Sequence, residues 1–196
     1  RDLVRSRGLG DVYKRQFVGR LDAQKNPLML LRVARNVVKY YPKVIFTIVG
    51  DGEKYQECKE FIIENGLKEN VHLVGWQNDV KSFYKNHDIF MMTSIYEAFG
   101  LIFLEAGFNH LPTVATNVEG IPEVIINNET GLLCAPNDVS KMTENVIFLI
   151  ENPNIRKKLG DNAYVYVTRK FSSAEMVRKY NCLLYTSPSP RDRTRS

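Results

Sequence analysis

Short apolar runs rich in β-branched residues alternate along this chain with longer amphipathic segments, and this alternation restricts the fold more than any other feature. The clearest run is Val-Ile-Phe-Thr-Ile-Val at 44–49, which is typical of a strand buried on both faces of a sheet. The other predicted strands lie at 17–19 (the end of a first strand), 71–74, 89–93, 113–116 and 131–134. Strands and helices that alternate at this spacing predict a Rossmann-like parallel α/β sheet with helices on both faces.

Helix signals fill the segments between these strands. Asn26 followed by Pro27 predicts an N-cap with proline at the first helical position, which opens a helix that runs to about residue 40. A second helix is predicted over about 53–65, with Gly66 just beyond its end. The remaining predicted helices cover about 80–86, 101–108, 139–151, 153–170 and, after a Ser-Ser-Ala-Glu capping box, a segment that begins at 172.

Both ends of the chain resemble translated sequencing adapter. With one choice of codons, the DNA for residues 182–192 is the reverse complement of the DNA for residues 6–16. Selection on a fold does not produce such a match, so we expect 1–16 and 182–196 to be adapter-derived and exclude them from the fold prediction. The native part is then 17–181, which we expect to be one domain of a longer protein, truncated at both ends.

The formal net charge of +5 does not indicate an anionic partner once these ends are set aside. The 16 N-terminal residues contribute three of the charges and the 15 C-terminal residues two, which leaves 17–181 neutral. Nucleic-acid binding loses its main electrostatic support, and we expect none. No apolar run approaches the ~20 residues of a membrane span. Cys58 and Cys134 lack CxxC spacing and are expected to be two reduced thiols.

The loop after the first strand, Gly-Arg-Leu-Asp-Ala-Gln-Lys-Asn-Pro at 19–27, is a candidate phosphate-binding segment. Ligands of parallel sheets bind at the carboxyl ends of the strands, and this loop leaves such an end. Gly19 permits close approach of a ligand, and the cations Arg20 and Lys25 stand just before a helix N-terminus, which itself attracts anions. The alternative interpretation is a solvated loop with ordinary surface cations.

A second candidate segment follows the strand at 89–93 and reads Ser-Ile-Tyr-Glu-Ala-Phe-Gly-Leu-Ile-Phe-Leu-Glu over 94–105. Glu97 lies in the strand-to-helix turn, and Glu105 lies two turns into an otherwise apolar helix. A carboxylate is costly to bury without partners, so Glu105 either reaches the helix edge or accepts hydrogen bonds, for which a pair of ribose hydroxyls is suitable.

Other motifs are interpreted as structural. Val-Glu-Gly-Ile-Pro-Glu at 118–123 predicts a tight turn into a short helix. Gly-Asp-Gly at 50–52 predicts a turn and helix cap, since the third glycine of a dinucleotide fingerprint is absent. No P-loop and no Asp-x-Asp motif is present, and the three histidines have no ligand spacing, so we expect no metal site. Trp76, at a strand end, either packs at the rim or flanks a nucleobase.

Taken together, these segments resemble the donor-binding C-terminal half of the GT-B glycosyltransferases of retaining family 4, the glycosyl transferases group 1. The matching segments occur in the family's order and cover nearly all of 17–181. They are Gly19-Arg20 with Lys25 and Pro27, the Val-Gly-Asp-Gly at 49–52, the run from Ser94 to Glu105, the Leu-Pro-Thr-Val-Ala-Thr at 111–116, and the Gly-Ile-Pro-Glu-Val at 120–124. The chain departs from the family pattern at 108–110, where small residues are usual, and we expect His110 to tolerate a left-handed backbone there.

The resemblance implies a role for each candidate residue. Arg20 and Lys25, beside Gly19, would hold the diphosphate of a nucleotide-sugar and neutralise it as it leaves, without a metal or other cofactor. Glu97 would contact the sugar, and with Arg20 and Lys25 it would form the catalytic group. Glu105 would accept the ribose hydroxyls, and the backbone around Phe99, Gly100 and Leu101 would approach the sugar and phosphates.

The resemblance also implies partners and a location. The acceptor would be held by a missing N-terminal domain of the same chain, so residues 17–181 alone should transfer no sugar. A cytoplasmic location is implied, with peripheral association at the inner membrane face through the missing domain. Two other functions stay open: a non-catalytic nucleotide or sugar-phosphate binding domain, and a nucleotide-sugar epimerase of the same architecture.

Overall fold

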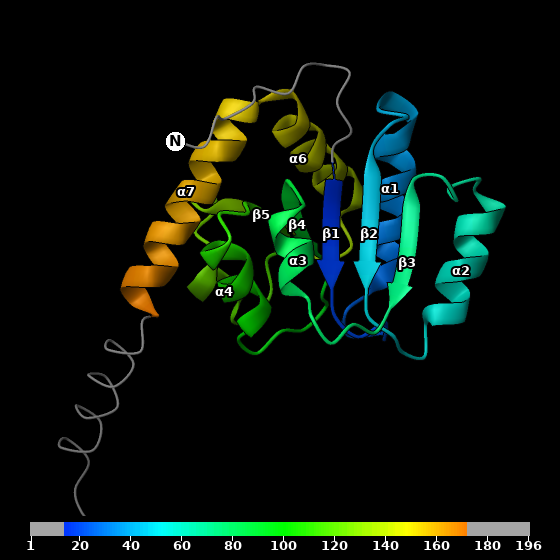
Figure 1. The fold of residues 1–196 in the computed structure, drawn as a ribbon, viewed down its shortest axis with the longest axis horizontal. Helices are drawn as coiled ribbons and strands as arrows, with labels where there is room; N and C mark the ends of the chain where they lie inside the picture. Colours follow the sequence, from blue (N-terminus) through cyan, green and yellow to red (C-terminus); the bar gives the residue numbers. More distant parts are fainter. Residues whose placement is uncertain (1–13, 172–196) are drawn as a thin grey trace, which may run out of the picture.

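The computed structural model describes residues 14–171, so the helix predicted to begin at 172 and most of both predicted adapter segments lie outside the described residues. The described strands form one parallel sheet in the order β3-β2-β1-β4-β5-β6 (Figure 1). Their bounds are β1 Lys14–Val18, β2 Ile45–Val49, β3 Val71–Gly75, β4 Ile89–Met92, β5 Thr113–Thr116 and β6 Gly131–Cys134. The predicted parallel α/β sheet is confirmed.

Helices cover both faces of this sheet. In Figure 1, α3 and α4 lie in front of the sheet, whereas α1 and α6 lie behind it and pack against each other. The helix α2 packs on α1, and α7 contacts both α4 and α6 beside the β6 edge. The helices are α1 Pro27–Tyr40, α2 Tyr55–Glu64, α3 Lys81–Lys85, α4 Leu101–Phe108, α5 Ile121–Val124, α6 Val139–Glu151 and α7 Pro153–Lys170.

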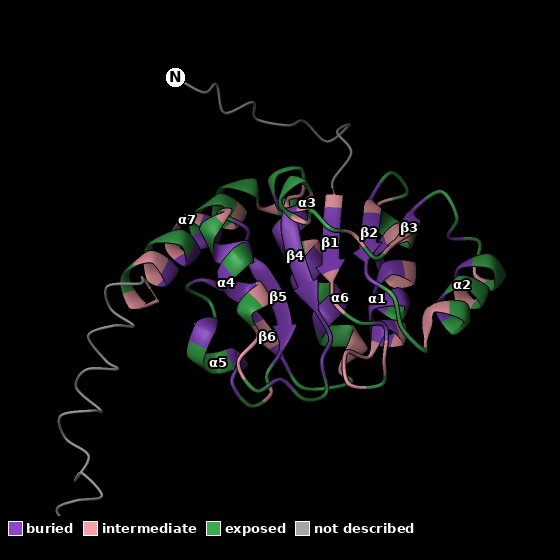
Figure 2. Cartoon of the chain, turned by 60° about the horizontal axis from the view of Figure 1, so that its bottom comes forward, coloured by how far each residue is buried: buried purple, intermediate pink, exposed green. Residues whose placement is uncertain are grey.

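The strands are the most buried part of the molecule, as the purple sheet in Figure 2 shows. All residues of β4 and β5 are buried, which explains why their sequences are continuous apolar or threonine-containing runs instead of alternating ones. The helices that cover them bury one stripe each; α1, for example, buries Met29, Leu30, Val33 and Val37 against the sheet and α6. The core is therefore continuous on both sides of the sheet.

The first strand begins earlier than the prediction that placed only its end at 17–19. Lys14, Arg15 and Gln16 pair with β2 in parallel register, because strand hydrogen bonds use the backbone and do not depend on the side chain. Arg15 and Gln16 are consequently buried, although polar residues are unusual at such positions. An ion pair joins Arg15 Nη1 to Asp88 Oδ2 at 4.0 Å.

The predicted start of α1 is confirmed, with Asn26 at the N-cap and Pro27 as the first helical residue, but the cap is built differently from the usual one. Asn26 occupies the N-cap position, but its backbone is left-handed (φ 48°) and its side chain makes no capping hydrogen bond. Instead its Nδ2 donates to Asn137 Oδ1 at 2.9 Å, a contact with the loop before α6 that local sequence does not reveal. Elsewhere the left-handed backbone predicted at His110 is confirmed, with φ 57°.

The strand order places a crevice next to the candidate loops. Sequence-adjacent strands run outward from β1 in one direction and from β4 in the other, so the order reverses between these two neighbours. Loops that leave the carboxyl ends of two such strands diverge to opposite faces and leave a ligand-binding crevice between them. The loops after β1 and β4 are the two segments singled out from sequence.

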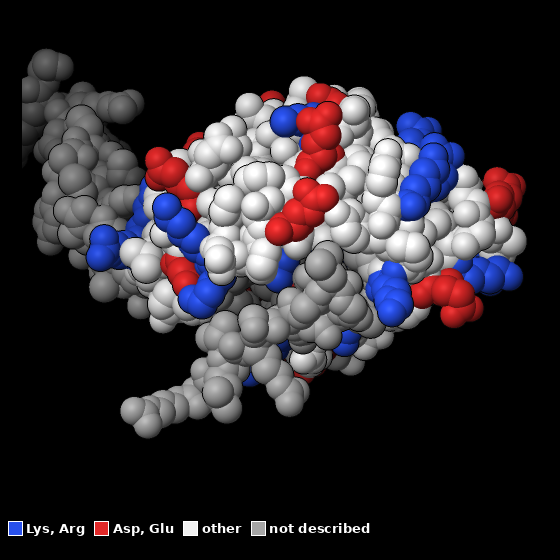
Figure 3. All heavy atoms as spheres, turned by 90° about the horizontal axis from the view of Figure 1, so that it is seen from above, with Lys and Arg blue, Asp and Glu red and all other residues white. Residues whose placement is uncertain are grey.

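Positive and negative charges are mixed at the amino-terminal ends of the strands, which lie opposite the candidate loops. Figure 3 views the molecule from the amino-terminal ends of the strands, and on its described surface Lys and Arg lie interspersed with Asp and Glu, without a continuous basic stripe. Within residues 14–171, no helix is both long and apolar enough to cross a membrane.

Candidate functional site

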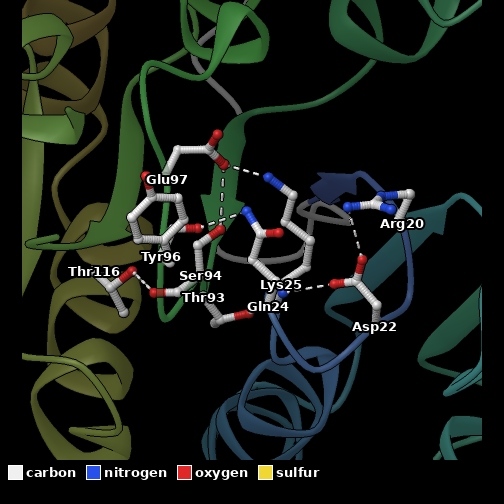
Figure 4. Close-up of polar contacts among 9 residues, drawn as sticks. All are labelled: Arg20, Asp22, Gln24, Lys25, Thr93, Ser94, Tyr96, Glu97 and Thr116. Atoms are coloured by element: carbon white, nitrogen blue, oxygen red, sulfur yellow. Dashed lines mark hydrogen bonds and ion pairs between the residues drawn. The ribbon is translucent and has the colours of Figure 1, made fainter. Parts of the chain in front are cut away.

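The loops that follow β1 and β4 are hydrogen-bonded to each other at the switch point of the sheet (Figure 4). Ile95 N donates to Gln24 O at 2.8 Å, and Gln24 Nε2 donates to Tyr96 O at 3.1 Å. Thr93 Oγ1 donates to Lys25 O at 2.9 Å. Because these bonds join backbone to backbone as well as side chain to backbone, the two loops form one rigid unit in which candidate residues from both are held together.

Within this unit, Lys25 and Glu97 form an ion pair between Lys25 Nζ and Glu97 Oε2. The side chains are only 14% and 10% exposed, and Ser94 Oγ lies 3.5 Å from the same carboxylate oxygen. Charges this far from solvent require a partner, and each supplies the other's. The structure thus brings together two residues that are 72 positions apart in the sequence.

Arg20 lies near the start of the loop after β1, and its side chain is exposed. Its Nη2 is 3.2 Å from Asp22 Oδ2, while its side chain is 73% exposed. Asp22 also accepts a hydrogen bond from Lys25 N through Oδ1 at 2.9 Å. Sequence reasoning missed Asp22, although an aspartate three residues before Lys25 is the pattern of a side chain that closes a turn onto the backbone.

A cavity of about 250 Å³ opens beside Arg20 at the carboxyl ends of β1, β2 and β3. Its wall includes the backbone of Gly19 and the side chains of Asp51 and Val80. Trp76 lines the same cavity and is 68% exposed, so the rim interpretation and the nucleobase interpretation of this residue both fit its position. Arg20 lines this cavity, whereas Lys25 and Glu97 do not.

The segment between Glu97 and α4 leads into the N-terminal end of that helix and contributes backbone groups to the candidate site. Gly100 is the N-cap of α4 with φ 67°, and Leu101, the first helical residue, is 67% exposed. The first N–H groups of a helix have no partner inside the helix, so α4 offers donors and a partial positive charge at this point. Phe99 is half-buried and packs edge-on against Phe171, with ring centroids 5.6 Å apart.

The loop after β5 clamps the Glu97 segment from its other side. Gly120 N donates to Glu97 O at 2.9 Å, and Thr116 Oγ1 donates to Ser94 O at 2.6 Å. A Cβ atom at Gly120 would stand 2.0 Å from Ala98 O, so only glycine permits this approach. The predicted short helix after this turn is confirmed as α5, and the turn itself positions the Glu97 loop.

Glu105 lies apart from the cations, on an exposed position of α4. Its Oε2 accepts a hydrogen bond from Tyr84 Oη at 2.9 Å, and it forms no ion pair with Arg20 or Lys25 in the described structure. Tyr84 is fully buried, and its burial, together with the Glu105 charge, raises the pKa of its hydroxyl far above the ordinary value. Tyr84 therefore stays protonated and holds the carboxylate in place. No pattern in the sequence indicated that Tyr84 would be the partner of Glu105.

The histidines and cysteines have structural environments. His87 contacts Phe83 O through Nδ1 and Thr47 Oγ1 through Nε2, and His110 stacks on Tyr164 with ring centroids 4.2 Å apart. Burial raises the pKa of the free thiols Cys58 and Cys134 to about 11 each. Among residues 14–171, no three His, Cys, Asp or Glu side chains are grouped so that they could hold a metal ion.

The family model described as glycosyl transferases group 1 matches residues 10–166 of the chain. A curated relative, the UDP-Gal:alpha-D-GlcNAc-diphosphoundecaprenol alpha-1,3-galactosyltransferase of Escherichia coli, is 32% identical over an alignment of 153 residues, and the match covers 73% of this chain and 40% of the relative. This chain spans less than half the length of the curated relatives it matches.

Solved structures show the same fold. TarM of Staphylococcus aureus, in complex with fondaparinux, alpha-GlcNAc-glycerol and UDP, superimposes with a TM-score of 0.84 at 26% identity, over 89% of this chain and 35% of that one. The C-terminal domain of a glycosyl transferase group 1 family protein, LpcC of Francisella tularensis, has a TM-score of 0.77 at 26% identity and covers 82% of this chain and 87% of its own.

Proposed function

The chain belongs to the glycosyl transferases group 1 family, and from this premise we propose that it is the donor-binding part of a retaining, family 4 type enzyme that transfers a sugar from a nucleoside diphosphate. The observation that carries the proposal is the joined pair of loops at the switch point, where Arg20 and Lys25 lie with Glu97 at the start of α4. Cations beside a helix N-terminus form a site for a diphosphate.

The chemistry of sugar transfer fits these groups. When the bond between the anomeric carbon and the phosphate oxygen breaks, negative charge develops on the departing nucleoside diphosphate. Arg20, Lys25 and the first backbone N–H groups of α4 would stabilise that charge, and because they would already contact the diphosphate of the bound donor they need little reorganisation when the bond breaks. We propose that the transfer needs no metal ion, since these cations supply the positive charge that a metal would otherwise bring.

The remaining donor contacts are assigned by position. The cavity beside Arg20, with Trp76 at its rim, would take the nucleobase. Glu105 would accept ribose hydroxyls through Oε1, since Tyr84 already holds Oε2. Glu97 would contact the sugar. UDP is the first nucleotide to test, because it is bound in the TarM structure and is the nucleotide of the donor named for the E. coli relative.

The acceptor side is also a proposal. Because the chain spans less than half of its relatives' length, we propose that the acceptor is held by a further, N-terminal domain and that this chain alone transfers no sugar. Peripheral contact with the inner membrane face would be made by that domain, in the cytoplasm.

The proposal is tested by titrating the 196-residue chain with UDP, GDP, ADP and NAD⁺ in EDTA by calorimetry. We expect saturable binding of one nucleoside diphosphate. Lys25→Ala should weaken it at least about tenfold, because a charge-assisted hydrogen bond contributes about 1.5–3 kcal/mol. Lys157→Ala is the matched control, since Lys157 is an exposed lysine of α7 that pairs with Asp161. Binding of NAD⁺ alone, or of no nucleotide by the folded chain, would contradict the proposal.

A further inference from the structure

Lys25 has an anionic partner within the protein, and this partner is Glu97. The proposed function requires Lys25 to bind a diphosphate, yet its ammonium group is engaged with a carboxylate that is itself almost fully enclosed. An ammonium has three N–H donors, but two negative groups at hydrogen-bonding distance from one cation repel each other, so the carboxylate and the diphosphate compete for Lys25.

The backbone of neither residue is able to relieve this conflict. Lys25 N is held by Asp22 and Lys25 O by Thr93, while Glu97 O accepts from Gly120 N. What remains movable is the two side chains, which have rotatable bonds beyond these anchors. An incoming anion must therefore meet Lys25 through a change of rotamer in the pair, with the loops staying where they are.

From this geometry we infer that Glu97 is the resident counter-ion of Lys25 and that the diphosphate of the donor displaces it. The inference rests on the proposed function. Displacement couples two events: Lys25 turns to the phosphates, and the Glu97 carboxylate, without its cation, turns to the hydroxyls of the donor sugar. A neutral sugar brings no anion to take the place of Glu97, so it leaves the pair intact. Glu97 thus restricts the site to anionic, diphosphate-bearing ligands.

Competition between Glu97 and the ligand predicts whether a mutation of Glu97 raises or lowers the affinity for a diphosphate. If Glu97 competes with the ligand for Lys25, removal of its charge strengthens the binding of a diphosphate that carries no sugar. If Glu97 only supports the shape of the site, its replacement leaves that affinity unchanged or weakens it. Inorganic diphosphate and UDP are suitable probes, because neither contains the sugar that Glu97 is proposed to contact.

The experiment is calorimetric titration of the 196-residue chain and its variants with inorganic diphosphate and with UDP, without metal. We expect Glu97→Gln, which keeps the size and hydrogen-bonding capacity of the side chain, to bind both probes about tenfold more tightly than the unaltered chain. Glu123→Gln is the matched control, since it removes one exposed carboxylate from α5 at the same edge of the sheet, and it should shift affinity by less than about twofold.

Glu97→Asp provides a second variant if the glutamine variant does not fold. Its carboxylate is one methylene further from Lys25, so we expect tighter binding of both probes, by a smaller factor. Equal or weaker binding of UDP by the folded Glu97 variant, with loss of binding in Lys25→Ala, overturns the counter-ion inference and leaves the donor site standing. Failure of the unaltered chain to bind UDP, GDP or ADP overturns both.

Discussion

Gln16 is a polar residue in a poorly matched, buried position. It lies in β1, between β2 and β4, is 1% exposed, and neither atom of its side-chain amide has a hydrogen-bond partner in the described structure. Such groups lose their hydration on folding and regain nothing, at a cost of about 1–3 kcal/mol. A side chain of similar volume without polar atoms suits this position better.

We therefore expect Gln16→Leu to stabilise the fold, raising the free energy of unfolding by about 1–2 kcal/mol. Urea denaturation followed by circular dichroism measures the change. Gln56→Leu, on the exposed surface of α2, is the control for a general effect of added hydrophobicity and should stay within about 0.5 kcal/mol. A Gln16→Leu variant less stable than the unaltered chain would show that the amide has a favourable role in the core.

His87 gives the stability of the protein a dependence on pH. Burial lowers the pKa of its imidazole below the usual 6.5, and because a carbonyl oxygen only accepts, Nδ1 carries the proton and donates to Phe83 O while Nε2 accepts from Thr47. Below pH 6.5 the unfolded chain binds a proton that the folded chain resists. Stability is thus complete above pH 6.5 and falls as the pH decreases towards the folded-state pKa.

The measurement is the midpoint of urea unfolding between pH 5 and pH 8. We expect the midpoint to decrease below pH 6.5 and this part of the decrease to be smaller in His87→Gln, which keeps a hydrogen-bonding side chain that does not titrate. His72→Gln, at an exposed position of β3, is the control and should follow the unaltered chain. Equal slopes in His87→Gln and the unaltered chain would disprove the assignment to His87.

At the scale of elements, the site depends on three loops that are stacked in the order β1, β4, β5. The loop after β4 is fixed by Gln24 on one side and by Gly120 on the other. Since neither neighbour belongs to the loop that carries Glu97, the position of this carboxylate depends on contacts between loops that are distant in sequence. A change in the outer loop should reach the ligand site without touching the ligand.

Gly120→Ala tests this dependence. The added methyl group would meet Ala98 O, so the loop that leads into α4 must shift, and we expect a loss of about 1–3 kcal/mol in unfolding free energy. UDP binding should weaken as well, because the first N–H groups of α4, which are proposed to contact the phosphates, move with this loop. Gly66→Ala is the matched control. It has a left-handed backbone (φ 66°) and open space at the end of α2, so it should lose stability through strain but keep its UDP affinity. Equal UDP affinity in the Gly120→Ala and Gly66→Ala variants would show that the contact made by Gly120 does not affect ligand binding.

At the scale of the whole molecule, the proposed donor site lies at the carboxyl ends of the strands of a single sheet, so its occupancy should stabilise the entire described domain. A ligand at 100 times its dissociation constant adds about 2.7 kcal/mol to the folded state. For a domain of this size that corresponds to a rise in Tm of roughly 5–10 °C. We expect this rise with UDP in a thermal unfolding scan, and little rise for Lys25→Ala at the same concentration.

Much of the fold follows from local sequence alone. The strands and helices were predicted within a few residues, because burial on both faces gives continuous apolar runs and one buried stripe gives a helical period, and both patterns are local. The same locality explains why the N-cap at Asn26 was predicted but the partner of its side chain was not, and why the start of β1 was missed, since a distant residue and the neighbouring strand decided these features. The adapter origin of the ends stays a prediction.

Only part of the candidate site could be predicted from the sequence. The residue types and their loops indicated phosphate and sugar chemistry, and they led to Arg20, Lys25, Glu97 and Glu105. Tertiary structure decided the rest: the strand order that makes the loops of β1 and β4 neighbours, the pairing of Lys25 with Glu97 across 72 positions, and the support from Asp22, Tyr84 and Gly120. A pattern along the chain specifies which element forms, whereas contacts between elements depend on how the sheet is assembled, and that assembly is encoded in no single segment.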